Sequence, residues 1–107
     1  MMNYQEMSNT QINVEVAKAL GFDSKLFLEA VECGEKPLYG EIFDPCSSWN
    51  DAGPIAEEFK IAAAHYKKGD GYIWHVFGPG DINYSQIYDS NPRRAICIVF
   101  LMMKGGE

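Results

Sequence analysis

The chain has 107 residues, of which 47% are hydrophobic and 22% charged, and 9 basic against 15 acidic residues give a net charge of −6. This is the composition of an ordinary globular protein, and the length predicts one domain, residues 1–107, with a core of its own. The negative charge argues against binding to duplex DNA, which requires clustered positive charge to displace counterions.

The chain carries no sign of export or of membrane insertion. Its start, MMNYQEMSNTQ, has neither the basic nor the apolar region of a secretion signal. The apolar run 95–103 is far shorter than the ~18 residues that indicate a transmembrane helix. The 3 cysteines have no paired spacing, which predicts reduced thiols inside a cell. We therefore expect a cytosolic protein that does not enter a membrane.

The segment MSNTQINVEVAKALG predicts a helix over 9–20. Ser8 is the expected N-cap, and Gln11 falls at the third helical position, where its side chain completes a capping box. Apolar residues recur every fourth position from Ile12, and Gly21 supplies a left-handed stop.

The next segment, from Lys25 to Phe43, has two interpretations: a helix that stops at Gly34, or two strands that turn through 34–37. The composition of LYGEIF favours the strands.

The segment DPCSSWNDAGPIAEEF predicts the opening of a second helix. Pro54 suits a first-turn position, where a backbone donor is unpaired in any case. Asp51 or Asn50 would then be the N-cap.

The segment KIAAAHYKKGDGYIWHVFG predicts a hairpin around a Gly69-Asp70-Gly71 turn. A three-residue turn would place His65 directly opposite His75, close enough for two metal ligands. No Cys or carboxylate has the spacing to complete a set, so we expect neutral sheet histidines and no metal. The following PGDINYSQIYDSN predicts a loop with at most one short helical turn.

The last element is a helix with Asn91 as N-cap, Pro92 at its first position and Gly105–Gly106 after its end. Its apolar run Ala95–Met103 would need cover on most sides, so we expect it at the centre of the core. The elements together predict an α+β fold: a small, mostly antiparallel sheet packed by an N-terminal, a middle and a C-terminal helix.

Three blocks of the chain resemble a family of small proteins from tailed bacteriophages and prophages, the NinX-like family. They are NYQEMSNTQINVEVAKALG, FDPCSSWNDAGPIAEE and NPRRAICIVFLMM, and together they span about half of the chain. The resemblance implies a phage accessory protein of the host bacterial cytoplasm, and it implies no particular reaction. Arg94 falls where the family motif has its arginine, whereas Arg93 stands at a position expected to be apolar.

Two arginines at a helix start oppose the helix dipole, which raises the question of what they bind. A guanidinium beside free backbone N–H groups forms an anion site suited to phosphate. The alternative is that Arg93 and Arg94 pair with carboxylates or cover the apolar helix. Of the two, we expect Arg94 to be the better anion ligand, because it matches the family motif.

Trp49, in SSWNDAGP, offers a flat surface for a base at another helix opening, although a packed core anchor is the alternative. If the two helix openings share one cleft, they would form a pocket for a nucleotide-like ligand. The candidate ligand-binding residues are then Ser48, Trp49, Asn50, Asp51, Asn91, Arg93 and Arg94.

The sequence contains no nucleophile elbow, HExxH helix or phosphate-binding glycine loop, so we expect neither an enzyme nor a cofactor. Our first hypothesis is a protein that binds an anionic ligand of the cyclic nucleotide or cyclic ADP-ribose type without transforming it. Compact phage proteins that sequester nucleotide signals of bacterial defence systems are similar in size, an analogy only at the level of fold and host.

The alternative hypothesis is a protein-interaction module acting on a host or phage replication or defence protein. Its motivation is the acidic charge and the aromatics Tyr72, Trp74, Tyr84 and Tyr88, because aromatic residues are enriched in interface hot spots. An apolar helix in so small a protein also predicts a homo-oligomer, in which a second copy covers one face.

Overall fold

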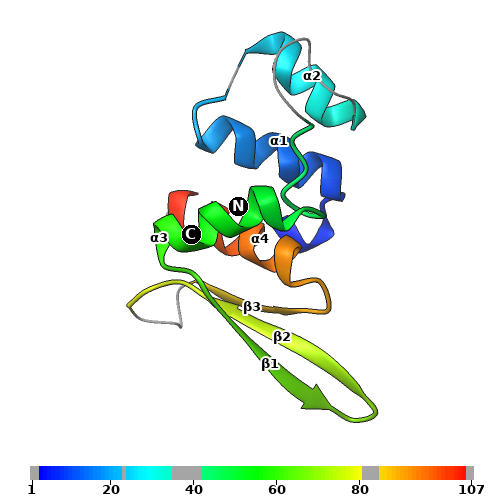
Figure 1. Ribbon diagram of the computed structural model, residues 1–107, viewed down its shortest axis with the longest axis vertical. Helices are drawn as coiled ribbons and strands as arrows, with labels where there is room; N and C mark the ends of the chain where they lie inside the picture. Colours follow the sequence, from blue (N-terminus) through cyan, green and yellow to red (C-terminus); the bar gives the residue numbers. More distant parts are fainter. Residues whose placement is uncertain (1–2, 23, 35–41, 81–84, 106–107) are drawn as a thin grey trace.

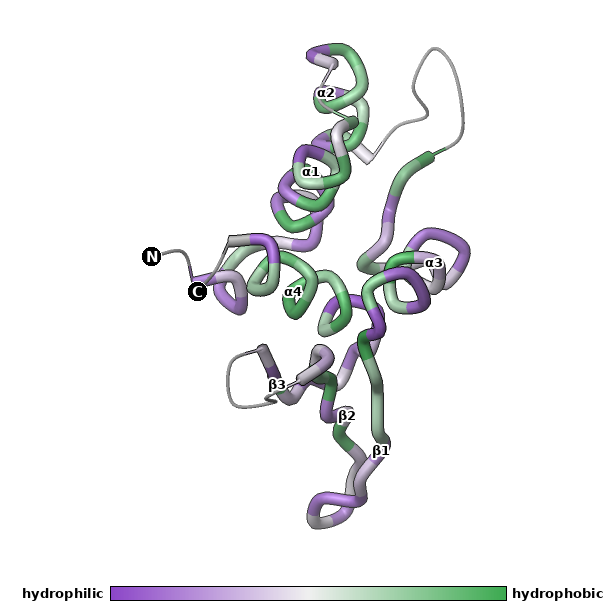
Figure 2. Tube along the Cα trace, turned by 90° about the vertical axis from the view of Figure 1, so that its left-hand side faces the viewer, coloured by the Kyte–Doolittle hydropathy of each residue, from purple (hydrophilic) through white to green (hydrophobic). Residues whose placement is uncertain are grey.

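The computed structural model describes residues 3–22, 24–34, 42–80 and 85–105. Its helices lie on one side of a three-stranded antiparallel sheet, with α2 at one end of the molecule and a hairpin at the other (Figures 1 and 2). The predicted α+β class is therefore confirmed. In chain order the elements are η1 (Tyr4–Glu6), α1 (Asn9–Ala19), α2 (Lys25–Cys33), α3 (Trp49–Phe59), β1 (Ala62–Lys68), β2 (Gly71–Phe77), β3 (Gln86–Asp89) and α4 (Pro92–Gly105).

Helix α4 is the centre of the core, as its sequence predicts. Every residue from Ala95 to Leu101 is buried, and the helix packs against α1, α3, β2 and β3. Burial of this run contributes on the order of 10 kcal/mol before conformational entropy is subtracted. The predicted cap is also present, because Asn91 Oδ1 accepts the backbone N–H groups of Arg93 (3.0 Å) and Arg94 (3.2 Å).

Helix α1 follows its prediction to within one residue. The Gln11 N–H donates to Ser8 Oγ (3.2 Å) and the Ser8 N–H donates to Gln11 Oε1 (3.0 Å), which is the predicted capping box. Ile12 and Val16 are fully buried on one face. Gly21 follows the helix at φ 91°, the left-handed conformation that glycine adopts without strain.

The strand interpretation of the next segment is wrong for its first part, which is helix α2. Ser24 Oγ accepts the Phe27 N–H (3.2 Å) at one end, and Gly34 has φ 70° at the other. A cap at each end and packing against α1 outweigh strand composition. Residues 35–41, which would hold the turn and most of the second strand, lie outside the described residues, and Ile42 and Phe43 are not in a strand.

Helix α3 begins earlier than predicted, at Trp49, and Pro54 lies inside it. Ser48 is the N-cap position, in place of the expected Asp51 or Asn50. The reason is that Asp51 serves the preceding turn instead, where its Oδ2 accepts the Asp44 N–H at 2.9 Å.

The hairpin forms as predicted, but its turn is one residue shorter. Lys68 pairs with Gly71, which leaves a two-residue turn, and His65 therefore pairs with Trp74 while His75 pairs with Ala64. A shift of one residue moves a side chain to the other face of a sheet. The prediction that the two histidines lie directly opposite is therefore wrong, and they occupy opposite faces.

The segment predicted as a loop contains strand β3. It pairs with β2 from Trp74–Asp89 to Phe77–Gln86, so its conformation is set by backbone hydrogen bonds to a neighbouring strand. Four residues carry too little periodicity to reveal such a strand in the sequence. Residues 81–84 of the predicted loop lie outside the described part of the chain.

Candidate functional site

The two helix openings that carry the predicted site meet around the turn at residues 44–48. The Cys46 N–H donates to Asn13 Oδ1 on α1 (3.1 Å), and the Cys46 carbonyl accepts from Asn91 Nδ2 at the start of α4 (2.9 Å). The turn is thus held by two asparagines from different elements. This fixes the start of α3, at Trp49, beside the start of α4.

Trp49 and Arg93 are the predicted site residues that come together across these openings. The guanidinium carbon of Arg93 lies 5.4 Å from the centre of a Trp49 ring, within cation–π range. Trp49 is 47% exposed, so it is not a core anchor. Arg93 Nε is buried and has no hydrogen-bond partner within the described ranges. An exposed indole beside a guanidinium can stack on a ring and donate to an anion.

Arg94 points to the other side and joins α4 to the N-terminal segment. Its Nε lies 3.6 Å from the Asp89 carboxylate, and its side chain is 15% exposed. Its terminal nitrogens donate to Asn9 Oδ1 (2.6 Å) and to the carbonyls of Met7 (2.7 Å), Gln5 (3.0 Å) and Tyr4 (3.5 Å). These acceptors and Asp89 explain a cation at a helix start. That Arg94 also binds an anion stays a prediction.

The other predicted residues take different places around the turn. Asn91 caps α4, so the first free N–H groups of that helix already have an acceptor. Asp51 accepts from the turn, as described above. Ser48 stands at the N-cap of α3 without a side-chain hydrogen bond to the helix, and Asn50 is exposed in its first turn.

Two thiols are fully shielded from solvent, that of Cys46 in the turn and that of Cys97 on α4. A side-chain hydrogen bond with Cys46 and the burial itself raise the pKa of the Cys97 thiol well above its usual value, and the charges of Asp44 and Asp51 act in the same direction. Cys97 therefore stays protonated at neutral pH. Since the thiolate is the nucleophile, it is chemically inert there.

Sequence reasoning missed the residues that hold the turn, Asn13 and Asp44. Asn13 is 3% exposed and donates from Nδ2 to Asp44 Oδ1 at 2.8 Å. One signal was present, because Asn13 adjoins the apolar stripe of α1 that contains Ile12 and Val16, where a polar residue requires a buried partner. The identity of that partner could not be read from the sequence.

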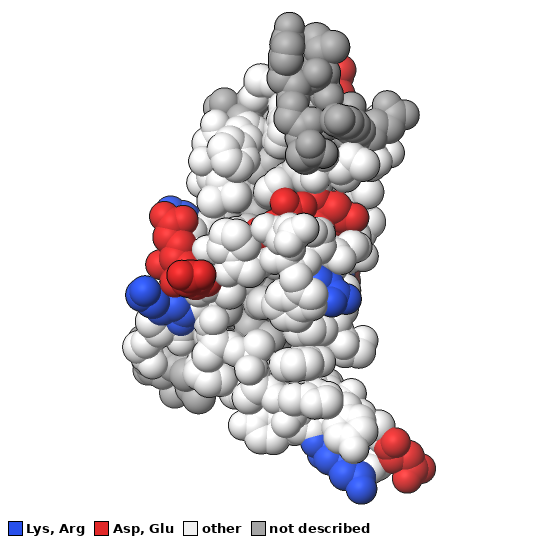
Figure 3. All heavy atoms as spheres, in the orientation of Figure 1, with Lys and Arg blue, Asp and Glu red and all other residues white. Residues whose placement is uncertain are grey.

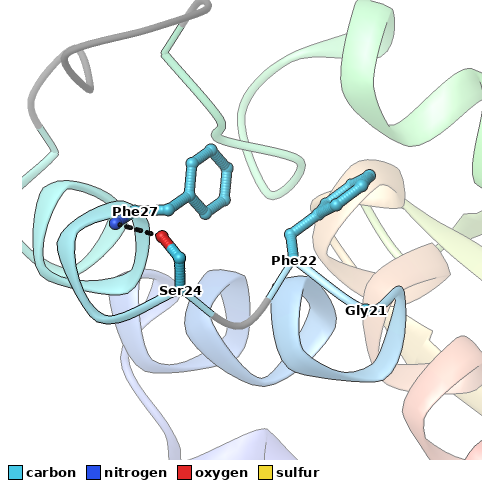
Figure 4. A pocket seen from close by; sticks show the side chains of 4 residues that line it. All are labelled: Gly21, Phe22, Ser24 and Phe27. Carbon is cyan, nitrogen blue, oxygen red and sulfur yellow. Dashed lines mark hydrogen bonds between the residues drawn. The ribbon is translucent and has the colours of Figure 1, made fainter.

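A separate hollow of about 350 Å³ lies between the end of α1 and the start of α2 (Figure 4). The rings of Phe22 and Phe27 line it at a centroid distance of 5.9 Å, together with Gly21 and Ser24. Its lining is mainly apolar and includes none of the predicted site residues. We therefore assign it no part in the candidate site.

The fold and the turn define a small α+β protein that presents an arginine–tryptophan pair at the junction of two helix starts. A family model described as Bacteriophage P22, NinX matches residues 3–104, and the chain belongs to this phage family. Searches of curated proteins and of solved structures each gave no match. Among the described residues, no helix has the length and apolar character needed to cross a membrane.

Proposed function

We propose that this phage protein binds an anionic, nucleotide-like ligand at Trp49 and Arg93, and releases it unchanged. The ligand class is that of cyclic nucleotides and cyclic ADP-ribose, which combine flat bases with phosphates. In the cytoplasm of the bacterial host, such binding would withdraw a defence signal from its receptor. The observation that carries the proposal is the Arg93 guanidinium 5.4 Å from the exposed Trp49 ring.

The chemistry of this pair matches both parts of such a ligand. A base stacks on an indole because both present π faces, and this contact contributes about 1–3 kcal/mol per base. Arg93 carries a planar fork of donors of the kind that fits a phosphate, and because its Nε is buried, the ligand would meet the terminal nitrogens. Arg93 and not Arg94 is therefore the cation to which we assign the ligand.

The charges nearby set a limit on the affinity. Asp44 and Asp51 lie close enough to act on Cys97, and they would repel an anion that approached the turn from their side. The Asp44 carboxylate accepts from Asn13, and the Asp51 carboxylate accepts the Asp44 N–H, which offsets part of their charge. We expect the ligand to contact the Arg93 side of Trp49.

In this proposal the ligand is bound without turnover. To test it, the purified protein is incubated with cyclic dinucleotides and cyclic ADP-ribose isomers, and heat-released ligand is analysed by mass spectrometry. We expect calorimetric binding and recovery of the intact ligand. Absence of binding across the panel, or recovery of a cleaved product, would contradict the proposal.

Variants locate the site. Arg93→Ala should weaken binding by about 10- to 100-fold, because hydrogen bonds to a charged group contribute about 1.5–3 kcal/mol. Trp49→Ala should have an effect of similar size, and Trp49→Phe a smaller one because the ring remains. The control Lys68→Ala removes one exposed positive charge from the end of the hairpin and should leave binding unchanged. If Lys68→Ala and Arg93→Ala lose equal affinity, the loss is an effect of net charge and not of a specific site.

A second candidate function, the protein-interaction module, is favoured by the hairpin. Tyr72 is 63% exposed and stacks on His65 at 4.8 Å, in the part of the hairpin that projects from the helices (Figure 1). Exposed aromatic rings on a projecting arm are typical of binding hot spots. Capture of a host or phage replication or defence protein that is lost in Tyr72→Ala and kept in Trp49→Ala would favour this function over ligand binding.

A further inference from the structure

Among the described residues, the helices cover one face of the sheet and leave the other open. Val76 and Ile87 on the opposite face are buried in the core, and α4 packs on β2 and β3. Because side chains alternate along a strand, the register assigns the other set of residues to the face away from the helices. We call it the open face, and its residues are Ala62, Ala64, Tyr66, Lys68, Gly71, Ile73, His75, Phe77, Gln86 and Tyr88. Figures 1 and 2 show no helix on that side of the sheet.

The open face is a packed aromatic surface. The His75 ring stacks on Tyr88 at 4.4 Å with an angle of 10° between the planes, and Phe77 lies 4.9 Å away. His75 Nε2 is also 2.7 Å from Gln86 Oε1. His75 is only 7% exposed, although it belongs to a face with no helix over it. The rings are thus ordered in advance, which lowers the entropy cost of binding a partner.

The charges of the molecule favour a second copy of the chain as the occupant. The open face contains no carboxylate, whereas many of the described acidic residues lie on helices, such as Glu57 and Glu58 on α3. Figure 3 shows charges at the hairpin tip and over the helices, with an uncharged stretch between them. Two molecules of net charge −6 approach with least repulsion through such a surface.

The same charges disfavour a nucleic acid on this surface. Stacking platforms for single strands also need cations along the path of the backbone. Lys68, at the end of β1, is the one lysine or arginine among the residues of the open face. A single cation at one end does not line a path for phosphates.

The chain exposes more surface than a compact monomer of its length. The chain exposes 6606 Å², whereas a compact monomer of this length exposes about 6,000 Å². Its radius of gyration is 13.8 Å, against about 13 Å for a compact domain. The excess of about 600 Å² is smaller than the ~800 Å² that each partner contributes to a standard interface, and it belongs to the whole elongated chain and not to the open face alone.

We propose that two copies of the chain associate through their open faces, with the sheets packed face to face about a twofold axis. Each copy then presents Tyr66 and Tyr88 to its partner, and the two sheets form the layers of a sandwich. This interface excludes Trp49 and Arg93, so it is independent of the proposed ligand site.

The test is the mass of the full chain in solution, by light scattering and sedimentation across a range of micromolar concentrations. We expect a dimer. Tyr88→Lys and Tyr66→Lys should each raise the dissociation constant by about 30-fold or more, as expected for a buried hot spot. The matched control is Tyr72→Lys, since Tyr72 is the most exposed of these tyrosines and lies on the other face. It should remain a dimer.

Circular dichroism and urea denaturation establish that each variant is folded, and the two variants lie on different strands so that one remains informative if the other unfolds. A wild-type chain that is monomeric overturns the proposal. A wild-type chain that associates only when single-stranded RNA is added overturns it as well. An equal loss of association in Tyr72→Lys also overturns it, because the interface would then lie elsewhere.

Discussion

Replacing Arg94 by alanine should destabilise the fold far more than the same change at Arg93, its neighbour in the sequence. Arg94 joins the N-terminal segment to α4 through three donated hydrogen bonds of 3.0 Å or less, to Asn9, Met7 and Gln5. In Arg93, by contrast, the described contact is the cation–π pair with Trp49.

The magnitudes follow from these contacts. A hydrogen bond to a charged group contributes about 1.5–3 kcal/mol, but the carbonyls around Gln5 can bind water once the guanidinium is removed. The Asp89 ion pair, at 3.6 Å, adds a small term that salt screens. We therefore expect Arg94→Ala to lower the free energy of unfolding by about 2–4 kcal/mol. Loss of the partly exposed cation–π pair in Arg93→Ala should cost about 0.5–1 kcal/mol.

The assay is urea denaturation followed by tryptophan fluorescence and circular dichroism. Arg94→Lys serves as a second control, because lysine keeps the charge but cannot present the same fork of donors. It should recover only part of the lost stability. If Arg94→Ala is no less stable than Arg93→Ala, then the contacts of Arg94 contribute nothing net, and the reasoning that assigns it a structural role is refuted.

Three further predictions concern the turn at residues 44–48 and the cysteines. Asn13→Ala leaves the Cys46 N–H without its acceptor and should lower the free energy of unfolding in urea by about 2–4 kcal/mol. The control Asn50→Ala changes an exposed residue and should lower it by less than about 0.5 kcal/mol. Similar values for the two variants would contradict the role of Asn13. Because the pKa of Cys97 is raised in the folded chain, the folded chain keeps a proton that the unfolded chain loses above about pH 8.5. The free energy of unfolding should therefore be highest below that pH and fall above it by up to about 1.4 kcal/mol per pH unit. Cys97→Ala should flatten this slope, and an unchanged slope would exclude Cys97 as its cause. In the same protein, iodoacetamide should modify the exposed Cys33 and spare Cys46 and Cys97, and equal reaction of all three would show that the buried pair is accessible.

Local signals in the sequence predicted the elements whose ends carry caps. Ser8 with Gln11, and Asn91 with Pro92, each fix a helix start through atoms only a few residues apart. The same kind of signal exists for α2, at Ser24 and Gly34, although the strand composition of the segment points to the other interpretation. Elements defined by such local contacts can be predicted without knowledge of the fold.

The candidate site was predicted in part. The sequence indicated that two helix openings would matter, and both Trp49 and Arg93 were among the residues expected there. Which arginine faces Trp49 depends on how α4 is placed between α3 and the N-terminal segment, since Arg93 lies beside Trp49 and Arg94 donates to the Met7 carbonyl. Adjacent residues on a helix point about 100° apart, so Arg93 and Arg94 necessarily serve different neighbours.

By itself the sequence determined the helical caps, the apolar α4 that forms the core, the hairpin and the α+β class, because each follows from composition or from contacts between near neighbours. Only the tertiary structure decided the early start of α3, the register of the hairpin and the existence of β3. It also decided that Arg93 lies beside Trp49 while Arg94 binds the N-terminal segment. All of these depend on partners distant in the chain: Asp44 for Asp51, β2 for β3, and the N-terminal carbonyls for Arg94.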